Sequence, residues 1–307
     1  MTIIAFHYNT EESILAVSDG LISRGDSRVM EENVKIICFT PRYKIPRISL
    51  KHLNGFEEYV GGRFCLAYAG NYTLIASTIN EIIAVMNHRL VLDRDKINGK
   101  PTIYRRTDEG AGLRDNFYLE DFNFSRDELP DLSLNLVANI VSEIVRKNCQ
   151  DFLRNAMTQP DIELLVFGRE IIKHQKNNRA QFISCKHAEI GKMELNRYSI
   201  LPWRPFCFGE KKSSEALLQQ FDDDKQFDNL NLVSNLKQAA ENWMERLNSL
   251  DINEKNRNRM IKNAVFKLIA TGTASIGGSC TIAEATRSQG IQIKTISHEV
   301  VVAAING

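Results

Sequence analysis

At 307 residues, the chain is long enough to bury a sizeable core, either as one large domain or as a domain with insertions. Apolar residues make up 43% of it and charged residues 25%, which is ordinary for a globular protein, and the net charge is +1. That balance gives no basic footprint, so we expect neither nucleic acid nor a membrane as a partner. Residues 1–13 lack the basic and apolar regions of a secretion signal, and no apolar run approaches the roughly 20 residues that span a bilayer.

The cysteines and histidines predict no metal site. The sequence has no CxxC pair, no Cys/His pair at zinc spacing, and no ligand spacing among its six histidines. Most cysteines lie in apolar stretches, where cysteine behaves as a small hydrophobic residue, so a reducing cytoplasm is the expected location. Without a glycine-rich phosphate loop, no cofactor is expected, and any use of ATP would come from a partner. The six cysteines are Cys38, Cys65, Cys149, Cys185, Cys207 and Cys280.

The first part of the chain predicts short strands followed by a helix. In chain order the predicted elements are two strands within 2–18 joined by a turn at 9–12, strands at 34–39 and 63–69, and an amphipathic helix at 73–90. The segment 41–58 is basic and punctuated by proline, which predicts an inserted loop. The strand predicted at 63–69 ends at Gly70.

The rest of the chain alternates between blocks of helices and blocks of strands. Residues 92–131 are rich in charge and show no sustained period, so they are predicted to be an insertion or mobile loop between the first two helices. The later predicted elements are helices at 132–157, 213–221, 230–247 and 256–270, and strands at 163–168, 180–185, 280–285 and 291–296. This block order favours layered sheets with helices outside them over a βαβ repeat, in a single domain covering 1–307.

Thr2 is a candidate nucleophile. Methionine aminopeptidases act when the second residue is small, so removal of Met1 would leave Thr2 with a free α-amine. A threonine hydroxyl is a weak nucleophile, and the α-amine of the same residue can act as its base, directly or through a water. The ordinary pKa of that amine, about 8, suits proton transfer near neutral pH. Threonine after methionine is common, so Thr2 alone indicates little.

Asp19 and Lys35 make the case for Thr2 stronger. Asp19 ends an apolar run and could simply belong to a turn, whereas Lys35 lies among apolar residues and could be an edge lysine reaching solvent. Taken together, a buried ammonium near the α-amine would lower the pKa of that amine, and a carboxylate would then be needed to orient the lysine.

The order of these motifs resembles proteasome β-subunits and their bacterial relatives. The resemblance runs from Thr2-Ile-Ile-Ala-Phe through Ile14-Leu-Ala-Val-Ser-Asp19 to Val34-Lys35-Ile36, with steps of 17 and 16 residues between Thr2, Asp19 and Lys35. Further matches are Phe64-Cys-Leu-Ala-Tyr-Ala-Gly70, Glu163-Leu-Leu-Val-Phe-Gly168, Phe208-Gly209 and Gly277-Gly-Ser-Cys-Thr-Ile-Ala-Glu-Ala-Thr. Together they cover about half of the chain.

This resemblance implies an α+β fold, a four-layer α/β/β/α sandwich of two antiparallel sheets with inserted loops, typical of N-terminal-nucleophile (Ntn) hydrolases. It also implies a threonine peptidase that cleaves peptides or unfolded proteins inside a self-compartmentalised homo-oligomer. Thr2 would attack the carbonyl carbon, Lys35 would assist its α-amine, and Asp19 would orient Lys35. The N–H of Gly70 would bind the oxyanion.

The resemblance assigns substrate contacts as well. The exposed strand segment that pairs with the substrate backbone corresponds to Gly20, Leu21, Ile22 and Ser23. Tyr68 falls at the floor of the side-chain pocket, where it would favour small or medium apolar P1 residues, although Tyr68 could equally be a core residue.

Two departures from the family bear on activity. Glu210 stands where relatives have a serine that supports the α-amine, and no aspartate precedes Gly277, where Thr273 and Ser275 lie instead. These positions could retune the α-amine or mark a structural or regulatory subunit without activity. A small-molecule or acyl-peptide amidase of the same superfamily is the other alternative. The insertion at 92–131 is either a solvated loop or a docking or gating element for a neighbouring subunit, a regulator or a partner ATPase.

Overall fold

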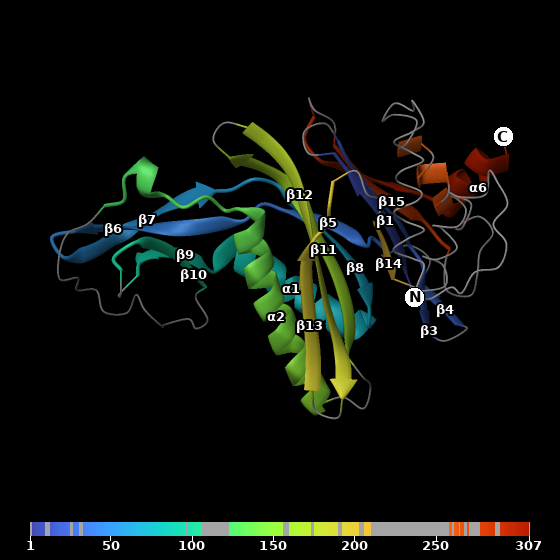
Figure 1. Cartoon of the computed structure of the whole chain (residues 1–307), viewed down its shortest axis with the longest axis horizontal. Helices are drawn as coiled ribbons and strands as arrows, with labels where there is room; N and C mark the ends of the chain where they lie inside the picture. The colour runs from blue at the N-terminus through green and yellow to red at the C-terminus, as the bar shows by residue number, and fades with distance from the viewer. Residues whose placement is uncertain are drawn as a thin grey trace.

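Two five-stranded antiparallel sheets lie at the centre of this α+β protein, whose computed structural model is shown in Figure 1. The structure describes residues 2–9, 13–24, 27–30, 33–95, 98–105, 123–155, 160–172, 175–189, 192–202, 206–209, 258–259, 261–263, 265–266, 269, 277–285 and 289–306. The first sheet has the order β14 (Phe206–Gly209), β1 (Ile3–Tyr8), β2 (Ile14–Asp19), β15 (Cys280–Ala285) and β16 (Gln292–Ile296). The second has the order β13 (Lys192–Ser199), β12 (Gln175–Glu189), β11 (Asp161–Ile172), β8 (Phe64–Gly70) and β5 (Ile36–Phe39).

The two sheets pack face to face through an apolar core. Ile4 and Phe6 of β1 meet Ala67 of β8 and Leu165 and Phe167 of β11, all of them buried. Successive residues of a strand point to opposite faces, so the intervening residues of β1 must be covered on the other side. Every residue of β1 and β2 is buried, which explains why both strands are almost continuously apolar.

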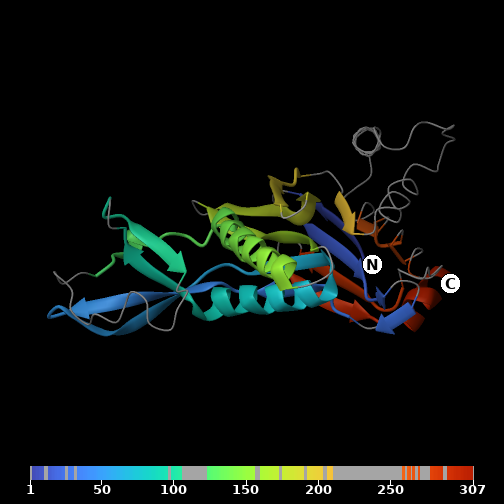
Figure 2. The ribbon, with the colours of Figure 1, turned by 90° about the horizontal axis from the view of Figure 1, so that it is seen from below.

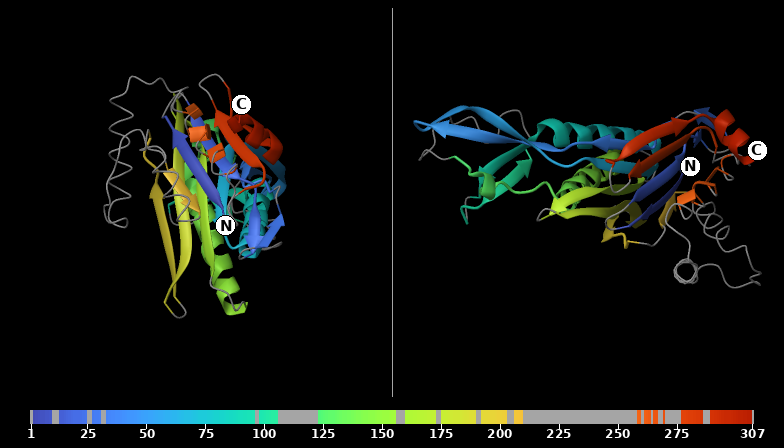
Figure 3. Two further views of the ribbon diagram at one scale, coloured as in Figure 1. Left: turned by 90° about the vertical axis from the view of Figure 1, so that its right-hand side faces the viewer. Right: turned by 90° about the horizontal axis from the view of Figure 1, so that it is seen from above.

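Helices cover the outer face of each sheet. On the second sheet, α1 (Tyr72–His88) and α2 (Leu134–Asn155) contribute to one large apolar cluster. On the first sheet, Ile261, Val265 and Val301 pack against β1 and β2, the last of them from α6 (His298–Asn306). Figure 1 shows this succession from α2, through β11 and β1, to α6. Figure 3 shows how β15 and β16, far along the chain, lie beside β1 and β2.

The helix boundaries follow from local capping. The side chain of Asn71 accepts a hydrogen bond from the backbone N–H of Leu74 at 3.2 Å, which begins α1 immediately after Gly70. Ser133 accepts in the same way from Leu136 at 3.2 Å and begins α2. The helices predicted over 73–90 and 132–157 are therefore confirmed. Those predicted over 213–221 and 230–247 lie outside the described residues, and α6 is an element that the sequence did not predict.

A third, four-stranded sheet, here called the arm, projects away from the two central sheets (Figure 2). Its order is β10 (Pro101–Arg105), β9 (Leu90–Arg94), β6 (Arg42–Ser49) and β7 (His52–Val60), with β6 and β9 parallel and the other pairs antiparallel. The prediction of an inserted loop over 41–58 is therefore wrong, because these residues form β6 and β7. In β6 the residues Tyr43, Ile45 and Ile48 are buried, and Pro46 is accommodated at a shift in the register between β6 and β7.

Parts of the second predicted insertion are ordered. Within 92–131, β9 continues to Arg94, β10 follows, and a short 3₁₀ helix η1 (Arg126–Glu128) precedes α2. Residues 106–122 lie outside the described residues. The hairpin of β11 and β12 is also longer than the strands predicted at 163–168 and 180–185, and β13 adds a strand that was not predicted.

Side-chain hydrogen bonds join the two central sheets at the end opposite Thr2. The Asn178 side chain, from β12, donates to the carbonyl of Asn9 at 2.7 Å and to that of Ser13 at 3.2 Å. The hydroxyl of Tyr8 donates to the carbonyl of Ile200 at 2.7 Å.

A last pair of short strands, β3 (Ile22–Arg24) and β4 (Ser27–Met30), follows β2. Among the described residues, no helix is long and apolar enough to cross a membrane.

Candidate functional site

Thr2 lies at one end of the first sheet, where three strands meet. It immediately precedes β1 and is 8% exposed. The register pairs Ile3 with Gly209, the last residue of β14, and Ile4 with Ser18, which places Asp19 across from Ile3. The backbone N–H of Ile3 donates to Oδ1 of Asp19 at 2.9 Å. The strand register therefore brings Thr2 and Asp19 together, as the sequence predicts.

Lys35 completes this group from the second sheet. Its Nζ donates to Oδ1 of Asp19 at 3.0 Å and to the carbonyl of Leu21 at 2.6 Å. The side chains of Asp19 and Lys35 are 0% and 2% exposed. A buried charge is tolerated when it is paired and hydrogen-bonded, and both conditions hold here. Lys35 is thus a buried residue of the site and does not reach solvent from an edge strand.

Burial dominates the electrostatics of the pair. It raises the pKa of Asp19, against the opposing effects of the Lys35 charge and of hydrogen bonds from the Ile3 and Gly277 backbones. It lowers the pKa of Lys35 from its usual value, against the opposing effect of the Asp19 carboxylate. Both shifts favour the neutral forms, so the proton between these side chains is less tightly held by the lysine than it would be in water. Such a lysine can take part in proton transfer.

The segment after Asp19 is held by backbone hydrogen bonds. The Gly20 N–H donates to the Gly277 carbonyl at 3.3 Å, and the Gly20 carbonyl accepts from the Asn33 N–H at 2.9 Å. A Cβ atom at Gly20 would lie 2.2 Å from Oγ of Ser279, so only glycine fits. The side chain of Leu21 is buried. These contacts engage Gly20 and the Leu21 carbonyl within the protein, so they are not an exposed edge for a substrate, contrary to the prediction.

Ile22 and Ser23 differ from their two predecessors. Both belong to β3, which pairs with β4. The other edge of β3 has no strand beside it in the part of the chain that the structure describes. Of the four predicted backbone contacts, these two therefore remain available for strand pairing.

Gly70 ends β8 beside the start of α1. Its φ of +121° lies in the region that favours glycine, and an added Cβ would lie 2.3 Å from the Asp161 carbonyl oxygen. The N–H of Tyr68 donates to the carbonyl of Lys35 at 3.2 Å, so Lys35 and Gly70 come from paired segments of the second sheet. The side chain of Tyr68 is buried in the cluster beneath α1 and α2, and its hydroxyl donates to the Val34 carbonyl. Tyr68 is therefore a core residue and not the floor of an exposed pocket.

Glu210, Thr273 and Ser275 lie outside the described residues. Two other residues near Thr2 were not predicted. Ser279 packs against Gly20, and its Oγ has no hydrogen-bond partner among the residues that the structure describes. Glu163 accepts a hydrogen bond from the backbone N–H of Gly209 at 3.0 Å. The signal for Glu163 was a lone carboxylate in the apolar run Glu163-Leu-Leu-Val-Phe.

The cysteines differ from their expected role in one respect. Cys38 of β5 and Cys65 of β8 form a disulfide between neighbouring strands, whereas the sequence predicts small hydrophobic residues. Cys149, Cys185 and Cys280 are buried free thiols, as predicted. Among the described residues, no group of three His, Cys, Asp or Glu side chains could hold a metal ion.

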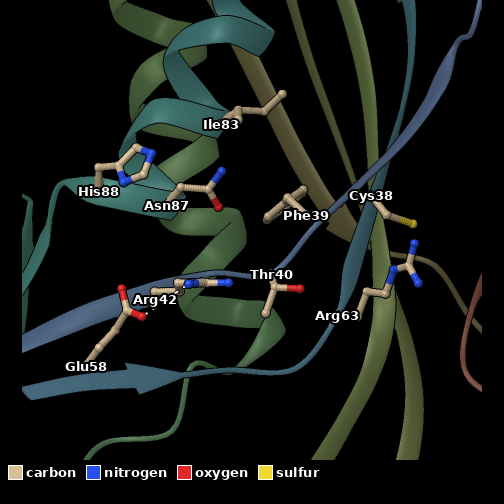
Figure 4. Close-up of a pocket in the computed structure, with 9 residues that line it drawn as sticks. All are labelled: Cys38, Phe39, Thr40, Arg42, Glu58, Arg63, Ile83, Asn87 and His88. Atoms are coloured by element: carbon tan, nitrogen blue, oxygen red, sulfur yellow. Dashed lines mark hydrogen bonds and ion pairs between the residues drawn. The ribbon is translucent and has the colours of Figure 1, made fainter.

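A separate pocket of about 470 Å³ lies where the arm meets the end of α1 (Figure 4). Asn87 and His88 line it from α1, and Arg42 lines it from β6, where it pairs with Glu58 of β7 at 3.1 Å. Arg63 lines it from the residue before β8. The pocket thus touches the end of β8 opposite Gly70, and none of the predicted site residues lines it.

The chain is similar to solved structures described as Anbu. Neither family models nor curated proteins match the sequence. Anbu (ancestral beta-subunit) from Yersinia bercovieri is 12% identical with a TM-score of 0.48, over 100% of this chain and 92% of that one. Anbu from Hyphomicrobium sp. strain MC1 is 12% identical with a TM-score of 0.47, over 100% and 94% of the two chains. A Gly-1 mutant of Anbu from the same strain is 12% identical with a TM-score of 0.48, over 99% of this chain and 93% of that one.

These comparisons correct the family assigned from the sequence. The motifs resemble proteasome β-subunits, but the solved structures to which the chain is similar are Anbu proteins, so the assignment to the proteasome β-subunits is wrong. At this low identity and TM-score the likeness carries no information on chemistry. The residues that bear on the chemistry of this chain are Thr2, Asp19 and Lys35.

Proposed function

We propose that the chain is a threonine-type N-terminal-nucleophile hydrolase that cleaves peptide bonds after removal of Met1. The observation that carries this proposal is the buried ion pair of Lys35 and Asp19, joined through Asp19 to the residue that follows Thr2. Burying an ammonium and a carboxylate is costly, and an apolar pair would serve the fold as well. A catalytic role for the pair at the N-terminal threonine accounts for its presence there.

In the proposed mechanism, Oγ1 of Thr2 attacks the carbonyl carbon of the scissile amide while its proton passes to the Thr2 α-amine. Lys35, which shares Asp19 with the Ile3 backbone N–H, would lower the pKa of the resulting ammonium and ease return of the proton. The negative charge on the carbonyl oxygen is stabilised by the N–H of Gly70. Collapse of the intermediate breaks the C–N bond, and the leaving amine takes the proton. Water then hydrolyses the acyl ester and restores the Thr2 hydroxyl.

The other parts of the protein have matching roles in this proposal. The open edge of β3 offers the backbone of Ile22 and Ser23 to an extended substrate, which favours a peptide over a small-molecule amide. The helices outside the two packed sheets fit a four-layer α/β/β/α arrangement. We extend the proposal to a homo-oligomer that encloses its peptide or unfolded-protein substrate.

Intact mass and a covalent probe test the proposal. A peptide epoxyketone reacts with both the hydroxyl and the free α-amine of an N-terminal threonine, so its adduct requires both groups. We expect the purified protein to lack Met1 and to form a single adduct on the peptide that begins at Thr2. The variant Thr2→Ala should form none, and Thr2→Ser should retain reactivity. Retention of Met1 together with an unreactive Thr2 would refute the proposal and favour a structural or regulatory subunit.

A further inference from the structure

Glu163 lies between the two central sheets near Thr2. It follows Ile162 on β11, which pairs with Gly70, and it pairs with Ala69 itself. Leu165 and Phe167, two and four residues further along β11, belong to the core between the sheets. Because alternate residues of a strand share a face, Glu163 faces the first sheet as well. Its side chain is 14% exposed.

Both carboxylate oxygens of Glu163 are occupied. Oε2 accepts a hydrogen bond from the backbone N–H of Gly209 at 3.0 Å, and Oε1 lies 2.7 Å from Nζ of Lys186. Lys186 is 54% exposed, so this ion pair is largely screened by solvent and contributes little to stability. The hydrogen bond from the Gly209 N–H is partly buried, and it is the contact through which Glu163 meets the first sheet.

Gly209 in turn lies against Thr2. It ends β14, the edge strand of the first sheet, and pairs with Ile3. A Cβ at Gly209 would lie 2.0 Å from the carbonyl oxygen of Thr2, and its φ of +108° also favours glycine. The end of β14 therefore limits where the Thr2 backbone can lie. Whatever holds Gly209 in place also holds Thr2.

Other charges near Glu163 come from the same sheet. Burial raises the pKa of Asp161, and the Glu163 carboxylate adds to the rise while Lys186 opposes it. Burial also raises the pKa of Tyr198, with the same opposing effects of Glu163 and Lys186. Among the described residues of this group, Glu163 reaches across to the first sheet, where it accepts a hydrogen bond from the Gly209 N–H.

From these contacts we infer that Glu163 is a positioning residue: by accepting the Gly209 N–H it fixes the end of β14 and keeps Thr2 placed for attack. The inference rests on the proposed function of Thr2. It does not require Glu163 to touch the substrate, and it makes the hydrogen bond, not the negative charge, the contribution that matters. Glutamine can accept the same hydrogen bond through its amide oxygen, whereas alanine cannot.

The test compares Glu163→Ala and Glu163→Gln with matched changes at Glu194. Glu194 is exposed on β13, two strands from Glu163 in the same sheet, where its carboxylate accepts from Asn196 at 3.0 Å. The rate of epoxyketone adduct formation at Thr2 and the hydrogen exchange of residues 3–8 and 206–209 are measured for each variant. Exchange of residues 175–189 reports whether the second sheet remains folded.

For Glu163→Ala we expect adduct formation on the order of 10- to 100-fold slower, as for a misplaced reacting group. Exchange should become faster at 3–8 and 206–209 while 175–189 stays protected. Glu163→Gln should remain within about threefold of the wild-type rate, because glutamine can still accept a hydrogen bond from the Gly209 N–H. Both Glu194 variants should also remain within about threefold, because Glu194 lies two strands away on β13. The inference is overturned if Glu163→Ala forms the adduct as fast as the wild type and its residues 3–8 and 206–209 are protected equally well. It is also overturned if Glu163→Gln is as impaired as Glu163→Ala.

A failure of the proposed function gives a different result. In that case wild-type Thr2 forms no adduct at all, whatever residue occupies position 163. The hydrogen exchange of 3–8 then still decides whether Glu163 holds the Thr2 end of β1.

Discussion

Replacing Lys35 by methionine is the sharpest test of the buried ion pair. Methionine has nearly the length of lysine without its charge, so the change removes the ammonium and leaves the Asp19 carboxylate at 0% exposure. Asp19 keeps its hydrogen bond from the Ile3 N–H at 2.9 Å, but its contact with Nζ at 3.0 Å is lost. Breaking a buried pair from one side typically costs about 3–5 kcal/mol of the free energy of unfolding, because one charge stays buried without its partner.

The reasoning also predicts how the double variant behaves. Asp19→Asn removes the second charge while an amide oxygen can still accept from Ile3. Because no buried charge then remains, Lys35→Met with Asp19→Asn should recover about 1–4 kcal/mol relative to Lys35→Met alone. Urea denaturation of the wild type, the two single variants and the double variant at pH 7 gives this coupling directly.

The pH dependence of Lys35→Met supplies an independent check. Burial already raises the pKa of Asp19, and removal of the opposing lysine charge raises it further. A carboxyl whose pKa is higher in the folded state stabilises the fold below its unfolded pKa of about 4, and this stabilisation is lost as pH rises through the folded value. The deficit of Lys35→Met should therefore shrink when the pH is lowered from 8 towards 5. A deficit under about 1 kcal/mol, independent of pH, would show that the two side chains are not buried as a pair.

Two further changes test the packing around the site and the opposite end of the sheets. Gly20→Ala should lower the free energy of unfolding by about 1–3 kcal/mol, because its Cβ would lie 2.2 Å from Oγ of Ser279. The control is Gly290→Ala, whose Cβ would enter open space. Equal stability of the two variants in urea would contradict this contact. Burial raises the pKa of Tyr8, whose hydroxyl binds the Ile200 carbonyl, to about 12. Tyr8 should therefore contribute a loss of up to about 2.7 kcal/mol in the free energy of unfolding between pH 10 and 12, so Tyr8→Phe should lose stability less steeply than the wild type over this range, as denaturation at each pH would show.

The sequence predicts the site where local pattern and strand register agree. Thr2 and Asp19 lie on adjacent strands whose apolar runs are obvious, so a hairpin between them brings the two residues together. The position of Lys35 among Val34, Ile36 and Ile37 left an edge lysine and a buried one open. Its combination with Thr2 and Asp19 favoured burial, and its hydrogen bond to the Leu21 carbonyl was not predicted. The role of Glu163 depends on which strand passes over it from the other sheet, and no local pattern carries that information.

The arm was missed for a physical reason. Its two-residue turn places Leu50 and Lys51 at φ values of 53° and 60°, the geometry that usually requires Asn-Gly. Pro46 within β6 also argues against a strand unless a shift in the register accommodates it, as happens here. For Tyr68, the sequence left a core position and a pocket position open. The packing of α1 and α2 against β8 decides for the core.

The polar links between the two central sheets lie at opposite ends of their shared core. Lys35 and Glu163 cross from the second sheet to the first beside Thr2, and Asn178 crosses at the far end. Apolar packing alone resists separation of two sheets but only weakly resists sliding of one over the other. Links at both ends oppose such shear, so the residues from the two sheets that meet at Thr2 should keep their relative positions until the sheets themselves come apart.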